Sequence, residues 1–299
     1  MPSGARGGKR RARREGVEAE PAPEGGAARA DAKFAARCEV LRRYYASVDR
    51  AEWWWLFDDS LEVIAGQLER EGYCVLDGFL PPRQSTALRG EVEGVHRAGG
   101  LEAAGLVNGK ADSNAAKYTD TATRGDVIGW FDANKECWPY GRTLDSYLLK
   151  LGTLIQELKG HVPELKKVTG RSKAMVACYP GGGARYVKHV DNDGKHPLCR
   201  TRLLTGLMYL NDGWRAGDGG ELAVLGPADA SGQNAERQVV EPLSGRLVLF
   251  WSDWRIPHEV RAAHKPRYAV TLWFLDSTQK AAEAEPTPQL PAAPPPAPA

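Results

Sequence analysis

Long hydrophobic runs are absent from this chain of 299 residues. No stretch approaches the roughly eighteen apolar residues that a membrane-spanning helix needs, and the first residues lack the hydrophobic core of a secretion signal. Cysteine is also scarce, since only five cysteines occur, at positions 38, 74, 137, 178 and 199. Their odd number and scattered positions do not indicate a disulfide framework, and the paired spacing of a zinc finger is missing. We therefore expect no membrane partner and a reducing compartment, the cytoplasm and/or the nucleus.

A large excess of charge of one sign is missing as well. The chain has 40 Lys and Arg residues against 38 Asp and Glu residues, which gives a net charge of +2. A nearly neutral chain offers no general argument for binding nucleic acid, so we expect no direct nucleic-acid partner. The local exception is the basic cluster Lys9–Arg14. This cluster fits a nuclear localisation signal, a polyanion contact, a solvated tail or part of a transit peptide, and the sequence leaves these alternatives open.

Composition divides the chain into four segments. Residues 1–32 are rich in Gly, Ala, Arg, Pro and Glu, and residues 280–299 are rich in Pro and Ala. Both segments have little to bury, which predicts a disordered basic tail and a disordered Pro/Ala-rich tail. Residues 33–60 predict a helical lead-in, and residues 61–279 predict one folded domain. The adjacent tryptophans Trp53–Trp55 fit base stacking or peptide capture, but packing against a core is favoured, because adjacent residues cannot share one helix face.

Hydrophobic periodicity indicates the fold class. Apolar residues at helical spacing predict helices over 60–71, 83–98 and 143–158, with a short strand at 73–76. After residue 170 the chain changes to short apolar or alternating runs, separated by turns rich in Gly, Asp and Pro. These runs predict strands at 174–179, 186–189, 201–210, 221–224, 246–251 and 268–274. Helices followed by many short antiparallel strands indicate an α+β fold with a mainly β core, a double-stranded β-helix (jelly roll) flanked by N-terminal helices.

The most informative pattern is His189-Val190-Asp191, with His258 far along the chain. Alternate residues of a strand share a face, so His189 and Asp191 can contact one ion. His258 follows the strand predicted at 246–251 and offers a third ligand. Two imidazoles and one carboxylate on one face of an octahedral ion leave positions open, as in non-haem Fe(II) oxygenases. Either part alone arises often by chance, but the combination predicts an Fe(II) site and an enzyme that uses O2.

Arg267 begins the alternating segment predicted as the last strand. A guanidinium binds a carboxylate through two parallel hydrogen bonds, which suits the distal carboxylate of 2-oxoglutarate. Thr271 falls four residues later on the same strand face and could assist. Arg267 alone would more often be a solvated charge, so its assignment depends on the nearby metal ligands.

Several long motifs occur in order along the second half of the chain. They are Gly170–Gly181, Tyr186–Asn192, Tyr209–Asn211, Phe250–Asp253, Pro257–Val260 and Arg267–Trp273. Together they closely resemble the catalytic core of hypoxia-inducible-factor prolyl hydroxylases, which are 2-oxoglutarate-dependent prolyl 4-hydroxylases. The similarity extends from about Leu61 to Asp276. It implies that residues 61–279 form an Fe(II)/2-oxoglutarate dioxygenase domain, with its catalytic core at about 170–276.

The resemblance also implies roles for individual residues. The iron ligands of the family fall on His189, Asp191 and His258, and its cosubstrate-binding arginine falls on Arg267. Other cosubstrate-pocket positions of the family correspond to Tyr209, Tyr179, Thr271, Leu207, Met175 and Trp273. A charged pair that braces the substrate entrance corresponds to Asp126 and Arg202, and Trp130 falls in the mobile loop there. For Met175, Leu207 and Trp273 a purely structural place in the core is an equally good interpretation.

The implied activity is that of a peptidyl-prolyl 4-hydroxylase acting on a protein or peptide that contains the target proline. Such an enzyme uses Fe(II), 2-oxoglutarate and O2, releases succinate and CO2, and is supported by ascorbate. Oxygen sensing is the corresponding physiological use. Two alternatives stay open: the same chemistry on another residue or target, and an inactive module that binds proline-containing peptides. The intact ligand triad and Arg267 argue against the inactive module.

Two segments depart from the family pattern. The segment Asn108–Asp126 is a few residues longer than its counterpart, which covers the substrate in the family. Peptide specificity can therefore differ. The stretch Asn192–Cys199 keeps a turn-like composition with different residues. We expect His196 within it to be an exposed loop residue and not a metal ligand.

Overall fold

The computed structural model describes residues 36, 39, 52–105, 120–132, 138, 141–194, 197, 199–228 and 231–278. The predicted tails 1–32 and 280–299, the basic cluster and most of the helical lead-in lie outside these residues, as does His196. The same holds for residues 108–119 of the predicted substrate loop. The domain boundaries therefore stay predictions.

Three α-helices form where the apolar spacing predicts them. They are α2 (Asp58–Glu71), α3 (Pro82–Arg97) and α4 (Thr143–Leu158). The helix α2 ends at Gly72, whose φ of 80° is left-handed and therefore favours glycine. The helix α4 begins where backbone N–H groups of Thr143 and Leu144 donate to the carboxylate of Glu91 on α3. In the described part of the chain, no helix is both long enough and apolar enough to cross a membrane.

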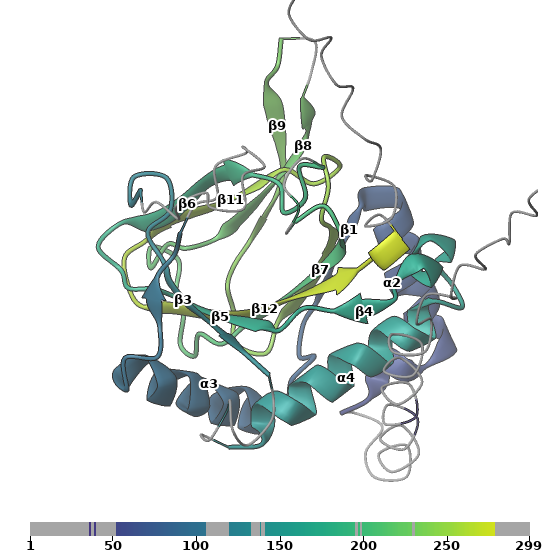
Figure 1. The fold of residues 1–299 in the computed structure, drawn as a ribbon, viewed down its shortest axis with the longest axis horizontal. Coiled ribbons are helices and arrows are strands. Elements are labelled where there is room, and N and C mark those ends of the chain that lie inside the picture. The colour runs from purple at the N-terminus through teal and green to yellow at the C-terminus, as the bar shows by residue number, and fades with distance from the viewer. Residues whose placement is uncertain are drawn as a thin grey trace, which may run out of the picture.

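A large antiparallel sheet lies against these helices (Figure 1). Its strand order is β1-β10-β7-β12-β5-β3-β2, and β4 also pairs with β12. The bounds are β1 (Tyr73–Leu76), β2 (Glu102–Ala103), β3 (Val127–Phe131), β4 (Gly170–Arg171), β5 (Ala174–Tyr179), β7 (Arg202–Tyr209), β10 (Leu247–Trp251) and β12 (Arg267–Leu275). Strands β5, β7, β10 and β12 are almost entirely buried. Buried strands are rich in apolar residues, and these apolar runs made the four strands predictable from the sequence.

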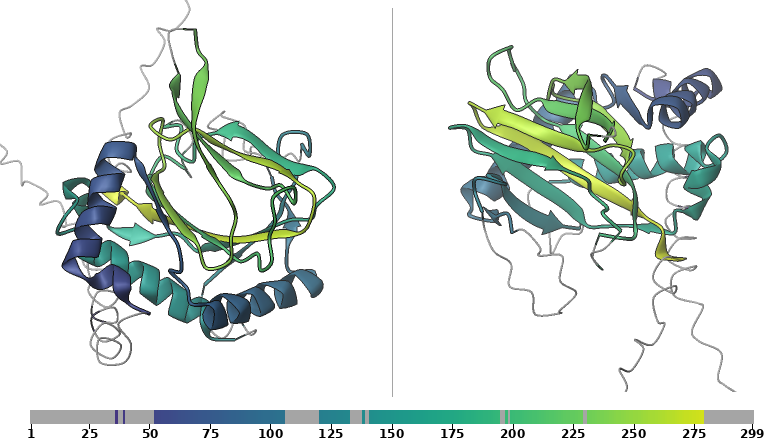
Figure 2. Two further views of the ribbon diagram at one scale, coloured as in Figure 1. Left: turned by 180° about the vertical axis from the view of Figure 1, so that it is seen from behind. Right: turned by 90° about the horizontal axis from the view of Figure 1, so that it is seen from above.

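A smaller antiparallel sheet faces the large one (Figure 2). Its order is β6-β11-β8-β9, with bounds β6 (Ala184–His189), β8 (Leu222–Ala228), β9 (Asn234–Val240) and β11 (His258–Ala263). The hairpin of β8 and β9 projects away from the rest of the fold (Figure 1). Two facing antiparallel sheets with helices on the outside confirm the predicted double-stranded β-helix.

Each strand of the large sheet has two distinct faces. Gly206 of β7 lies against α4, because a Cβ built there would be 3.0 Å from Cδ2 of Leu151. Its neighbours Thr205 and Leu207 therefore point away from the helices, toward the small sheet. Paired residues of neighbouring strands point to the same side of a sheet. Leu207 pairs with Thr271 of β12, and Thr271 pairs with Met175 of β5, so all three side chains lie on this inner face. The predicted pocket residues thus share one face.

The sequence did not predict all strands. Strands β2, β3, β4, β9 and β11 were missed. The strand β9 is mostly exposed and polar, so it lacks the apolar alternation that identifies a strand. The predicted loop residue Trp130 lies in β3, paired with Met175 of β5, so the loop assignment was wrong. The core interpretation of the adjacent tryptophans is confirmed for Trp53 and Trp55, which are buried with ring centres 5.0 Å apart.

Candidate active site

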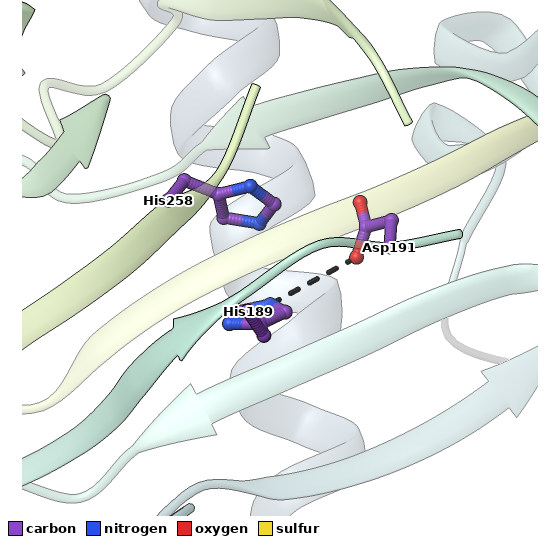
Figure 3. A group of neighbouring side chains, drawn as sticks. All are labelled: His189, Asp191 and His258. Atoms are coloured by element: carbon purple, nitrogen blue, oxygen red, sulfur yellow. Dashed lines mark ion pairs between the residues drawn. The ribbon is translucent and has the colours of Figure 1, made fainter. Parts of the chain in front are cut away.

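Three potential metal ligands converge between the two sheets (Figure 3). His189 ends β6, His258 begins β11, and the two residues are direct partners in the antiparallel register. Asp191 lies two residues beyond the end of β6. One ligand atom from each side chain lies within 4.8 Å of the other two. The predicted triad is therefore brought together, although β11, the strand that supplies His258, was not predicted.

Hydrogen bonds to the backbone fix the direction of both imidazoles. Nδ1 of His189 lies 2.9 Å from the carbonyl oxygen of Val187, and Nδ1 of His258 lies 3.0 Å from that of Ile256. A carbonyl oxygen only accepts, so each Nδ1 carries the hydrogen. Each Nε2 is left with a free lone pair. This arrangement is the usual way in which proteins orient a metal-binding histidine.

The carboxylate of Asp191 is oriented from the large sheet. Its Oδ2 accepts a hydrogen bond of 2.7 Å from the hydroxyl of Thr205, which in turn lies 2.8 Å from the hydroxyl of Ser252. Its other oxygen, Oδ1, lies 3.9 Å from Nε2 of His189. One oxygen is thus held by the protein, and the other faces the two imidazoles.

Electrostatics favour the protonation states that bind a cation. Burial lowers the pKa of His189, and the adjacent His258 lowers it further, so the imidazole is neutral. Burial acts to raise the pKa of Asp191, but the two histidines, Arg202 and the Thr205 hydroxyl together bring it below its ordinary value. Two imidazoles and a carboxylate form the donor set of mononuclear Fe(II) sites. The donor set therefore fits Fe(II).

A second group of functional side chains lies at one end of the large sheet. Arg267 begins β12, Tyr179 ends β5 and pairs with it, and Tyr209 ends β7. The guanidinium carbon of Arg267 lies 4.9 Å from the ring centre of each tyrosine, and its Nε donates to the carbonyl oxygen of Gly220 at 2.7 Å. A Cβ at Gly220 would be only 2.8 Å from Cδ of Arg267, so glycine leaves room for the arginine.

Two polar atoms of this group are buried without a hydrogen-bond partner, namely Nη2 of Arg267 and the hydroxyl of Tyr209. Burial raises the pKa of Tyr209, although Arg267 acts against the shift, so the hydroxyl stays a donor. Buried donors are rarely left unpaired in a folded protein. A guanidinium and a phenol that both lack an acceptor fit a carboxylate ligand, as 2-oxoglutarate would provide.

The remaining predicted pocket residues line the inner face between these groups. Leu207, Thr271 and Met175 form one row across β7, β12 and β5. Trp273, two residues after Thr271, is also buried and packs with Met175 in a small cluster separate from the main core. The structure thus places all four beside the interior of the two sheets. Their contact with a cosubstrate stays a prediction.

The predicted charged pair at the substrate entrance is not formed. Asp126 is bound instead by Arg124, whose Nε and Nη2 lie 2.7 and 2.9 Å from its two oxygens. Arg202 lies over the ring of Trp273 at 3.9 Å and donates to the carbonyl oxygen of Asp191. The pairing of Asp126 with Arg202 was therefore wrong. Arg124, two residues from Asp126 in the same segment, already occupies both carboxylate oxygens.

Trp130, the third residue predicted at the substrate entrance, is 42% exposed and lies 5.5 Å from Trp273, measured between ring centres.

The sequence analysis missed Thr205. This residue lies two positions before Leu207 and four before Tyr209 on β7, a spacing that places it on the inner face. Arg124 and its contacts were also missed, since the sequence carried no separate signal for them.

Comparisons with known proteins agree with this geometry. Residues 174–275 match the family model of the 2OG-Fe(II) oxygenase superfamily. The chain is 36% identical over 222 residues to human Egl nine homolog 1, covering 74% of this chain and 48% of that protein. It is equally similar, at 36% over 222 residues, to human prolyl hydroxylase EGLN3, of which it covers 86%. This chain therefore spans about half the length of the first relative and most of the second.

Among solved structures, the fold resembles a prolyl hydroxylase of Trichoplax adhaerens in complex with a peptide fragment of the hypoxia inducible factor oxygen degradation domain. The TM-score is 0.61 and the sequence identity 31%, over 76% of this chain and 96% of that one.

Proposed function

Because the chain belongs to the prolyl hydroxylases of the 2OG-Fe(II) oxygenase superfamily, we propose that it hydroxylates a proline of a protein substrate with O2 and 2-oxoglutarate. The products would be 4-hydroxyproline in the substrate, succinate and CO2. One observation carries the proposal. A His-Asp-His triad at the small sheet faces a large sheet that holds two buried donors without an acceptor.

Each side chain has a distinct task in this proposal. His189, Asp191 and His258 hold the metal through two Nε2 atoms and one carboxylate oxygen. Fe(II) and 2-oxoglutarate would activate O2 when bound, since 2-oxoglutarate gives up two electrons as it is oxidised to succinate and CO2, and the substrate C–H bond supplies the other two as it is hydroxylated. Arg267 and Tyr209 hold the distal carboxylate of the cosubstrate, which fixes its orientation in the interior.

The aromatic residues beside the triad support a peptide substrate. Trp130 is partly exposed, and its ring packs on Trp273, which in turn lies under the guanidinium of Arg202. Arg202 also donates to the backbone of Asp191, so this group adjoins the metal ligands. Aromatic rings and a positioned arginine are the residue types enriched where proteins bind peptides. We assign the substrate entrance to these residues.

We also propose that the enzyme acts in a reducing compartment, the cytoplasm and/or the nucleus. The three cysteines among the described residues, Cys74, Cys178 and Cys199, are free thiols, which supports it. Oxygen sensing is proposed as the physiological use. It rests on the likeness to the Trichoplax adhaerens enzyme, whose complex contains a hypoxia inducible factor peptide.

The test is turnover of the full chain with Fe(II), 2-oxoglutarate, ascorbate and O2. We expect succinate to form faster with a proline-containing peptide substrate than without it, and mass spectrometry to find an added oxygen on one proline. Candidate peptides come from hydroxyproline sites that disappear when the protein is depleted in cells. Succinate formation with oxygen added to another residue would favour a different target. The absence of both metal binding and succinate would overturn the proposal.

A further inference from the structure

The metal ligand His189 stands on an exposed edge, and a neighbouring segment braces it. His189 ends β6, which is the edge strand of the small sheet. Its partner ligand His258 begins β11, an interior strand with β6 on one side and β8 on the other. An edge strand lacks the second neighbour that holds a side chain in place. The edge therefore needs another support if His189 is to keep a fixed position.

The support comes from residues 120–126, the described end of the segment predicted to cover the substrate. Thr123, Arg124 and Gly125 run along the free edge of β6. Arg124 and Tyr186 form an antiparallel bridge. On one side of it, the N–H of Gly125 donates to the carbonyl oxygen of Arg185 at 2.9 Å. On the other side, the N–H of Val187 donates to the carbonyl oxygen of Thr123 at 3.0 Å. The edge of β6 is thus paired over three residues close to His189.

Side chains extend this pairing to the metal ligand itself. The ring of Tyr186 stacks on the imidazole of His189, with centres 3.6 Å apart and planes 16° from parallel. The guanidinium of Arg124 lies over the Tyr186 ring at 4.6 Å. Arg124 in turn binds both oxygens of Asp126, whose side chain is 1% exposed. Asp126 directly precedes β3 of the large sheet.

We propose that Tyr186 and Arg124 are positioning residues for His189, through the stack that they form against its imidazole. The hydrogen bond from Nδ1 to Val187 fixes one direction of the ring, and the parallel stack fixes its tilt. Since Asp126 anchors Arg124 beside the large sheet, the brace connects the substrate-covering segment to the metal ligand. This inference rests on the proposed function, in which His189 binds the metal.

The experiment measures metal binding alone, with Co(II) as the probe. Co(II) bound by two imidazoles and a carboxylate absorbs visible light, so its dissociation constant and spectrum are read without turnover. We expect Tyr186→Leu to weaken Co(II) binding by about tenfold and to alter the visible spectrum, as loss of a residue that orients a metal ligand does. Tyr186→Phe keeps the ring and should bind Co(II) within about twofold of the unaltered protein.

A matched control lies on the same strand. Lys188 is exposed and bonds to Asn234, so Lys188→Gln should leave Co(II) binding unchanged. Arg124→Lys keeps the positive charge but not the planar guanidinium, and should weaken Co(II) binding less than Tyr186→Leu does. This second variant tests the brace if Tyr186→Leu fails to fold, which a thermal melt without metal detects.

Three outcomes would overturn the inference. One is binding by Tyr186→Leu as tight as that of the unaltered protein. Another is an equal loss in Tyr186→Phe, which would assign the effect to the hydroxyl. A third, if Tyr186→Leu does not fold, is unchanged binding by Arg124→Lys. Failure of the unaltered protein to bind Co(II) would instead contradict the proposed function. Tight Co(II) binding without proline hydroxylation would leave the brace standing and overturn only the substrate assignment.

Discussion

The two halves of the proposed active site differ in how firmly the fold holds them. The carboxylate-binding half, Arg267 with Tyr209, belongs to neighbouring interior strands of the large sheet, and Arg267 is only 3% exposed. In the metal-binding half, His189 ends an edge strand and Asp191 lies beyond it, with side chains 18% and 11% exposed. The first half is set within a packed sheet. In the second half, His258 lies on an interior strand and is 4% exposed, whereas His189 and Asp191 are held at the edge by hydrogen bonds and a ring stack.

This difference suggests a division of labour. Interior strands with both neighbours paired keep their side chains in place before any ligand arrives. The carboxylate-binding half is therefore suited to 2-oxoglutarate, which is the same molecule in every catalytic cycle. The edge carrying His189 and Asp191 adjoins the segment at the substrate entrance, so its geometry can respond to the protein substrate.

Removing a metal ligand should have the largest effect. We expect Asp191→Ala to abolish tight metal binding and hydroxylation, because two imidazoles alone leave the cation without its charged ligand. Calorimetric titration with Fe(II) without oxygen and succinate formation measure the two losses. If the variant kept substantial turnover, the metal half would have been placed on the wrong residues.

In the carboxylate-binding half, Arg267→Ala should raise the KM for 2-oxoglutarate by about 100-fold, since the buried cosubstrate carboxylate loses its charged partner. Metal binding should stay near normal, which separates the two halves. Arg261 on β11 is an exposed arginine bonded to Glu236, so Arg261→Ala is the matched control. Turnover like that of the unaltered protein at low 2-oxoglutarate would contradict the assignment of Arg267.

The variant Thr205→Val tests the hydrogen bond by which the large sheet supports Asp191 of the metal-binding half. The change removes the hydroxyl that holds Oδ2 of Asp191 and nearly preserves side-chain volume. We expect metal affinity to fall by about tenfold, while the KM for 2-oxoglutarate changes little. Ser252→Ala removes the neighbouring hydroxyl without a direct bond to Asp191 and should have a smaller effect. Equal losses in the two variants would show that the direct bond is not decisive.

The smallest effect is expected for Tyr209→Phe. The variant loses one hydroxyl donor, but the guanidinium of Arg267 still binds the carboxylate, so we expect a net loss of about 1 kcal/mol and a rise of about fivefold in the KM for 2-oxoglutarate. Tyr147→Phe is the matched control, because that hydroxyl is also buried and unpaired but lies on α4. A change as large as that of Arg267→Ala would mean that the guanidinium is not the main carboxylate ligand.

The sequence predicted the parts of the fold that are buried. The helix α4 was predicted to the residue, and β5 likewise, because dense apolar residues fix both the element and its ends. The polar edge strand β9 carries no such signal. The strand β11 begins with His258 and mixes charged with apolar residues, so its pairing with β6 was not visible in the sequence.

The candidate site was predictable in its ligands and less so in its supports. The spacing of His189 and Asp191 predicted a metal, and the family resemblance predicted the residues of the cosubstrate pocket, which the structure places on one face of the large sheet. The partner of Asp126 could not be predicted, because two arginines were available and only the fold decides which one reaches the carboxylate. Contacts between distant segments, such as Thr205 with Asp191, depend on tertiary structure that local patterns do not contain.

The two-residue alternation of β12 has a consequence for how such a domain can change in length. Arg267 and Thr271 face the interior between the sheets, whereas Tyr268 and Val270 face the other way, where they pack in the main core. A substitution alters one side chain, but a single-residue deletion within the strand would exchange the two sets. Insertions and deletions should therefore be tolerated in the connection between β8 and β9 and rejected within β12. A deletion scan scored for folding would reveal this boundary.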